Sequence, residues 1–171
     1  MNNQFEEPQP LPIANSLLAN PEALHQALSN DGFLFFKQII SKQKILDLRR
    51  EVTDILADEG IIASGDETID ARAIAKSFRE GDEQYFKAHD RLIKLEAFHS
   101  LAHDRNLMAL MRSVLGESAF PHPLSIIRLI FPKNTPATTP PHQDFPNNQG
   151  SEKLTAACIQ LGDCPRELGP L

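Results

Sequence analysis

The chain has 171 residues, of which 41% are hydrophobic and 23% charged, a size and balance that predict one folded domain and exclude wholesale disorder. Its 17 basic and 23 acidic side chains leave a net charge of -6 without any Lys/Arg run, which argues against a nucleic-acid partner. Because no apolar run approaches a membrane span and the acidic N-terminus is unlike a signal peptide, we expect a cytoplasmic protein without a membrane partner.

The first 120 residues carry mainly helical signals. After an irregular lead-in over residues 1–15, Asn20 predicts the N-cap of a short helix that ends at Gly32. Ser41 opens the clearest helix, since apolar residues recur at helical spacing until Gly60 supplies a stop. Further helices are expected over residues 71–78, 82–95 and 104–115.

Strand signals are concentrated after residue 122. Residues 124–131 are β-branched and apolar between prolines, and residues 154–161 form a second such run. An earlier short run over residues 33–36 is also a strand candidate. Helices followed by strands favour an α+β fold in which an N-terminal helical layer supports a sheet.

The segment TPPHQDFP, residues 139–146, contains the sharpest chemical signal of the chain. If it is extended, His142 and Asp144 point to the same face with Cα atoms about 6.6 Å apart. Imidazole and carboxylate can then converge on one ion, as two ligands of a 2-His-1-carboxylate iron site. A loop histidine beside a turn-forming aspartate is the simpler alternative.

The sequence around this pair resembles the phytanoyl-CoA dioxygenase family of Fe(II)/2-oxoglutarate oxygenases. The resemblance rests on PPHQDFPNNQGS (residues 140–151), LTAACIQLGDCPRELGPL (154–171) and LSNDGFLFFKQIISKQKILDLRREV (28–52). It spans roughly residues 24–171, and residues 60–120 match in helical character alone.

The resemblance implies a specific fold and chemistry. N-terminal helices would support a partial double-stranded β-helix, or jelly roll, and residues 16–171 would be the N-terminal part of a single oxygenase-like domain. His142 and Asp144 would hold Fe(II), with 2-oxoglutarate as co-substrate and a small organic or acyl molecule as the substrate to be hydroxylated. Asp144 separates the chain from related halogenases, which have a small residue at this position.

Two basic residues are candidates for cofactor contacts by the same resemblance. Arg128, on the expected strand before the motif, would reach 2-oxoglutarate or substrate, or alternatively extend into solvent. Lys94 occupies a region that contributes a cofactor contact in some relatives, and a solvated helix-end lysine is the alternative. We expect the remaining histidines downstream of residue 88 to be surface or packing residues; they are His89, His99, His103 and His122.

The family pattern also requires a second histidine and an arginine downstream, and neither follows Asp144 at the expected place. Three or four of the eight strands of a jelly roll can be found, so we expect a fragment or a truncated, inactive product whose open sheet edges invite self-association. A non-catalytic binding or scaffold protein derived from an oxygenase is one alternative. A cupin-like metal isomerase or hydrolase that uses His122 is another.

Overall fold

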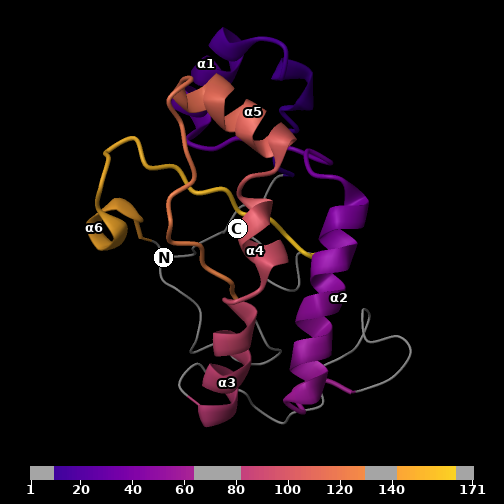
Figure 1. Ribbon diagram of the computed structural model, residues 1–171. Helices are drawn as coiled ribbons and strands as arrows, with labels where there is room; N and C mark the ends of the chain where they lie inside the picture. The colour runs from indigo at the N-terminus through magenta and orange to yellow at the C-terminus, as the bar shows by residue number, and fades with distance from the viewer. Residues whose placement is uncertain (1–9, 64–81, 130–141, 165–171) are drawn as a thin grey trace, which may run out of the picture. The chain divides into compact units, whose positions relative to one another are not determined.

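The computed structural model describes residues 10–63, 82–129 and 142–164 (Figure 1). The chain divides into two compact units, and each is described by itself. The first unit comprises Met1–Ile40 and Asp104–Phe120, and the second comprises Ser41–His103 and Pro121–Leu171.

The first unit contains the 3-10 helix η1 (Asn15–Leu17) and the α-helices α1 (Pro21–Asp31) and α5 (Arg105–Leu115). The side chain of Asn20 caps the first turn of α1. At the other end, Gly32 adopts a left-handed φ of 76°, a conformation that glycine reaches without steric cost. The predicted start and end of this helix are therefore confirmed.

α1 packs against α5, and this contact makes the core of the first unit (Figure 1). Leu24 of α1 is fully buried, and Leu107 and Leu110 of α5 are buried as well. Near the C-terminal end of α5 the Nε2 atom of His25 lies 2.9 Å from the carbonyl oxygen of Val114. Apolar burial thus holds the pair of helices together, with one polar contact at its edge.

A short parallel contact joins the segment before η1 to the segment after α1. Ile13 and Phe35 form an isolated β-bridge, and the amide of Ala14 donates to the carbonyl of Phe35 over 2.8 Å. The side chain of Asn15 extends the pairing, because it donates to the carbonyl of Lys37 over 2.8 Å and accepts from the Lys37 amide over 2.9 Å. The strand expected after Gly32 is thus reduced to a single bridge.

The second unit is mostly helical in its described part. Ser41 caps its longest helix by accepting a hydrogen bond from the amide of Lys44 over 3.3 Å, and Gly60 follows the helix with a φ of 69°. Both ends agree with the prediction. The helices of this unit are α2 (Lys42–Asp58), α3 (Glu83–Leu92), α4 (Glu96–Leu101) and α6 (Phe145–Asn148).

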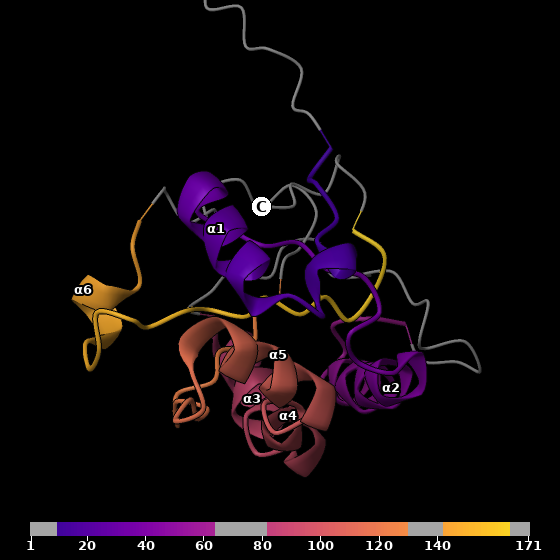
Figure 2. The same cartoon turned by 90° about the horizontal axis from the view of Figure 1, so that it is seen from above.

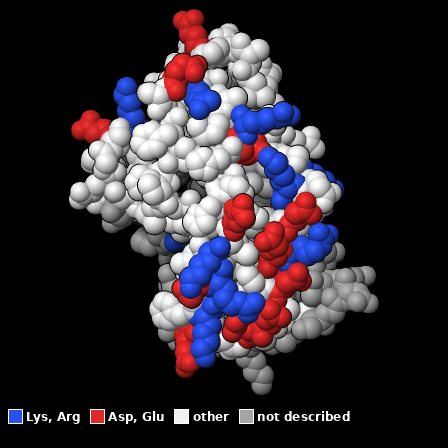
Figure 3. All heavy atoms as spheres, viewed as in Figure 1, with Lys and Arg blue, Asp and Glu red and all other residues white. Residues whose placement is uncertain are grey.

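α2 and α3 lie side by side and bury a shared apolar core (Figures 1 and 2). Arg91 of α3 links them at the end of α2, with ion pairs of 2.8 Å to Asp58 and 2.7 Å to Glu59. Hydrogen bonds to these two carboxylates raise the pKa of Arg91. Figure 3 shows acidic and basic side chains interleaved over this part of the surface. The buried apolar residues of the two helices are Leu48, Val52, Ile55, Leu56, Tyr85, Ala88 and Leu92.

The prediction of an α+β fold with a partial jelly roll is wrong: the described residues form helices and no sheet. Residues 124–129 and 154–161, which were expected to be strands, have no regular secondary structure there. β-branched residues are common in strands because their side chains fit a pleated, half-buried surface. A strand also needs a neighbouring strand to complete its backbone hydrogen bonds, and composition does not provide that neighbour. Residues 71–78 and 130–131, also part of the predictions, lie outside the described residues.

Over the described parts of the chain, no helix is both long and apolar enough to cross a membrane.

The cap of α1 gives a direct test of how this helix is stabilised. Asn20→Ala removes the side-chain oxygen that accepts from the amide of Ala23 over 3.1 Å. We expect the free energy of unfolding, measured by urea denaturation, to fall by about 1 kcal/mol. Asn20→Asp keeps an acceptor at the same place and should unfold close to the unmodified protein. Equal losses in the two variants would contradict the capping role.

Candidate metal site

His142 and Asp144 contact each other through their side chains, with 3.3 Å between Nε2 of His142 and Oδ1 of Asp144. Asp144 is the N-cap residue of the four-residue helix α6, and its φ of -70° and ψ of -35° are helical. Alternation along an extended strand is therefore not what brings the two side chains together. Its carboxylate makes no capping hydrogen bond and is directed to His142 instead.

The start of α6 follows from its sequence. Pro146 occupies the first turn, where its fixed φ suits a helix and its missing N–H costs no intrahelical bond. The amide of Asn148 donates to the carbonyl of Asp144 over 2.9 Å, which closes the turn. Asp144 is thereby held in the helical region directly after the loop that carries His142.

The separation of the two donor atoms fits the geometry of a metal site. Two ligand atoms about 2.1 Å from one ion, at right angles to each other, lie about 3.0 Å apart. The observed 3.3 Å is close to this value and is also an ordinary length for a direct contact between imidazole and carboxylate. The side chains of His142 and Asp144 are 44% and 43% exposed, which leaves room for further ligands.

The third ligand of a facial triad has no counterpart near this pair in the part of the chain that the structure describes. Across residues 10–63, 82–129 and 142–164, no three His, Cys, Asp or Glu side chains lie in a group that could hold a metal ion. What the described chain provides is thus one imidazole and one carboxylate. This donor set suits a divalent ion such as iron.

The structure places the two predicted cofactor residues in different settings. Lys94, in the turn between α3 and α4, forms an ion pair of 2.6 Å with Asp90 on the exposed surface. Arg128 lies in the irregular segment before the motif, and its side chain is exposed. Their roles toward 2-oxoglutarate stay predictions.

Three other histidines of the second unit have local partners, and His103 is exposed. The ring of His89 stacks on Tyr85 with 5.8 Å between the centroids. His99 lies 2.7 Å from the carbonyl oxygen of Ile93, and the Nδ1 atom of His122 accepts from the amide of Leu124 over 3.1 Å. The ring of His122 therefore contacts the backbone two residues further along the chain.

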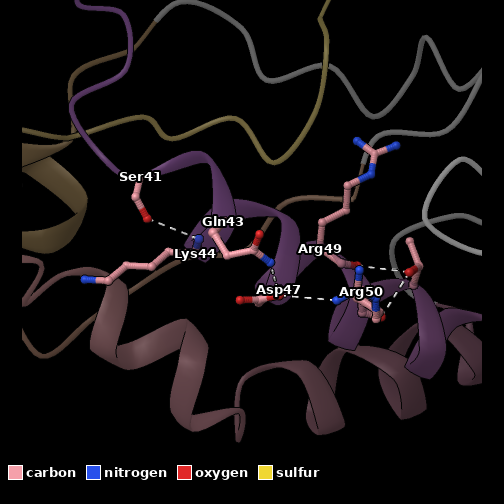
Figure 4. A network of polar contacts seen from close by, with 7 residues as sticks. Ser41, Gln43, Lys44, Asp47, Arg49 and Arg50 are labelled. Carbon is pink, nitrogen blue, oxygen red and sulfur yellow. Dashed lines mark hydrogen bonds and ion pairs between the residues drawn. The ribbon is translucent and has the colours of Figure 1, made fainter.

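Arg49 of α2 makes a long-range contact that the sequence did not predict. Its guanidinium donates to the carbonyl of Leu161 over 3.1 Å, across 112 positions of sequence. It also fills the space where a side chain at position 162 would begin, so only glycine fits there without a shift. Figure 4 shows Arg49 pointing away from the ion pair of Asp47 and Arg50 on the same helix.

The role of Arg49 could not be read from the helical pattern. An arginine on an exposed turn of a helix is normally solvated, and its distant partner is a backbone carbonyl that carries no signal of its own in the sequence. The one hint was Gly162, a glycine directly after an apolar run. Together they fix the segment that leads into Asp163 and Cys164.

A comparison with models of known protein families shows which family the chain belongs to. The family model for phytanoyl-CoA dioxygenase (PhyH) matches residues 28–171, which includes His142, Asp144 and the segment held by Arg49. The chain therefore belongs to the phytanoyl-CoA dioxygenase family, as the sequence resemblance predicted. Members of this family are generally Fe(II)- and 2-oxoglutarate-dependent oxygenases. Searches of curated proteins and of solved structures gave no match.

The contact between Arg49 and the segment at Gly162 can be tested by a double-mutant cycle. Arg49→Ala should lower the free energy of unfolding by about 1 kcal/mol, because it removes the hydrogen bond to Leu161. Gly162→Ala should also destabilise, because its new methyl group displaces the guanidinium. In the Arg49→Ala background the same glycine substitution should cost less, with a coupling of at least about 0.5 kcal/mol in urea denaturation. Additive losses would show that the two positions do not interact.

Proposed function

We propose that the protein is an Fe(II)- and 2-oxoglutarate-dependent dioxygenase that hydroxylates a small organic or acyl substrate. The observation that carries the proposal is the 3.3 Å contact between His142 and Asp144, at a spacing that suits two neighbouring ligands of one ion. The family match over residues 28–171 supports the choice of iron and 2-oxoglutarate.

In this proposal His142 and Asp144 bind and orient the metal. The neutral imidazole would offer Nε2, and the carboxylate would offer Oδ1 and neutralise part of the ionic charge. Iron bound there would supply the activation of oxygen that hydroxylation needs. Because both side chains are almost half exposed, the pair leaves coordination positions open to 2-oxoglutarate and water.

For 2-oxoglutarate, Arg128 is the better of the two predicted partners. A guanidinium can hold a carboxylate through two parallel hydrogen bonds, whereas a lysine ammonium acts as a point charge. Lys94 lies on the exposed surface, in an ion pair of 2.6 Å with Asp90. We therefore propose Arg128 as the contact to 2-oxoglutarate, with Lys94 in a surface role.

A non-catalytic binding protein derived from an oxygenase is the second candidate. It is favoured by the exposed apolar side chains of Leu124 and Ile126, which are 53% and 67% accessible. Large exposed apolar groups that lie close together are typical of surfaces that bind other molecules. Such a protein would retain the His142–Asp144 contact as an ordinary polar pair.

Anaerobic titration with Fe(II) tests the proposed function, with metal binding read by equilibrium dialysis. We expect one Fe(II) per chain, and a weak visible absorption band when 2-oxoglutarate is added. His142→Ala and Asp144→Ala should each weaken Fe(II) binding by more than about tenfold, since loss of even a residue that supports a ligand costs that much. Arg128→Ala should leave Fe(II) binding intact and weaken the response to 2-oxoglutarate.

His103→Ala is the matched control, because His103 is an exposed histidine outside the pair. It should bind Fe(II) as the unmodified protein does. Equal Fe(II) binding by the His142→Ala variant and the unmodified protein would overturn the metal site. Absence of any Fe(II) binding in the unmodified protein would favour the non-catalytic candidate.

A further inference from the structure

The first unit contains a small apolar cavity with one carboxylate beside it. The cavity has a volume of about 100 Å³ and is lined by the segment before η1, by η1, by α1 and by the segment that follows α1. All of its lining residues are apolar except Asp31, the last residue of α1. Among the apolar ones are Ile13, Leu17 and Phe35. An apolar cavity with a single charged group at a defined place is the usual plan of a small-molecule site.

Helical spacing places Asp31 at the mouth of this cavity. Asp31 follows Ala27 by four residues, and residues four apart lie on the same face of a helix. Ala27 is half-buried and Asp31 is exposed, so the lining runs from an apolar interior to a charged edge. Phe33 also lines the cavity and is 40% exposed. The mouth therefore combines a carboxylate with an aromatic ring.

The carboxylate of Asp31 lacks a compensating cation among the residues that the structure describes. It makes no hydrogen bond or ion pair there, and the last turn of α1 contains no basic residue. A carboxylate at this end of a helix also lies at the negative pole of the helix dipole, where a cation is favoured instead. The face of an aromatic ring such as that of Phe33 attracts cations as well. The carboxylate, the helix end and the ring thus all favour a positively charged ligand.

The size of the cavity limits the apolar part of such a ligand. An apolar cavity of about 150 Å³ holds the six carbons of benzene, so about 100 Å³ suits a body of about four carbons. We propose that the cavity binds a small alkylammonium ion, with its alkyl chain inside and its ammonium group beside Asp31. The chain is then removed from water while the charge stays at the exposed mouth. The proposal does not depend on the oxygenase function, since it uses no residue of the candidate metal site.

A ligand in this cavity should strengthen the short parallel contact of the first unit. Ile13, Ala14 and Phe35 line the cavity, and the amide of Ala14 donates to the carbonyl of Phe35 over 2.8 Å. A ligand that binds only when these two segments are together stabilises the paired state. We therefore expect hydrogen exchange at the Ala14 amide to become slower when the ligand is bound.

Titration of the full chain with butylammonium chloride, followed by the backbone amide signals in NMR spectra, tests the proposal. We expect saturable shifts at residues 13–14, 27–31 and 33–35, with a dissociation constant in the millimolar range, as suits a ligand of five non-hydrogen atoms. Butanol has the same chain without the charge, and butyrate has the opposite charge. Each should bind at least about threefold more weakly. Equal binding of the three probes, or shifts that do not saturate, would overturn the proposal.

Substitutions at Asp31 and Ala27 separate the charge from the cavity. Asp31→Asn should weaken butylammonium binding about threefold to fivefold, the effect of an exposed ion pair, and leave butanol binding unchanged. Glu22→Gln is the matched control, because Glu22 is an exposed acid in the first turn of the same helix, and it should bind as the unmodified protein does. Ala27→Leu keeps Asp31 but fills part of the cavity, so the shifts and the slower exchange at Ala14 should be lost. Butylammonium binding that is unchanged in Asp31→Asn or in Ala27→Leu would contradict the proposed site.

Discussion

The need of every backbone N–H and C=O for a hydrogen-bond partner governs this structure. A helix meets that need within its own segment, from one residue to the fourth before it, whereas a strand needs a second strand. In the described part of the chain, helices α1 to α5 satisfy their backbones locally, and α1 packs against α5 and α2 against α3. Residues 124–129 are apolar and rich in β-branched side chains, yet they have no regular secondary structure in the described part of the chain.

The candidate metal site, like the helices, depends on contacts between residues that are close in sequence. His142 and Asp144 are two positions apart, and the turn of α6 fixes the aspartate beside the imidazole. No distant element is needed for this contact, so it forms even though the described residues have no sheet to carry it. The match to the phytanoyl-CoA dioxygenase family covers both residues, and their side chains lie 3.3 Å apart.

Two arginines provide polar links between segments that are far apart in sequence. Arg91 joins α3 to the end of α2 through two carboxylates, and Arg49 joins α2 to the carbonyl of Leu161. The guanidinium group suits both tasks because it presents several donors in one plane and remains charged. The link by Arg49 joins a segment of the C-terminal region matched by the family model to the longest helix of the second unit.

The sequence by itself determined the helices and their caps, and it singled out His142 and Asp144 as the candidate pair. Asn20, Gly32 and Ser41 act through neighbours within four residues, and the apolar period of α2 selects its buried face, so local rules suffice. Only the tertiary structure showed that residues 124–129 and 154–161 do not form strands, because β-branched residues form a sheet only when a partner strand is in place. It also decided that Asp144 reaches His142 from a helical turn and that Arg49 meets Leu161, since both depend on where the chain places atoms in space.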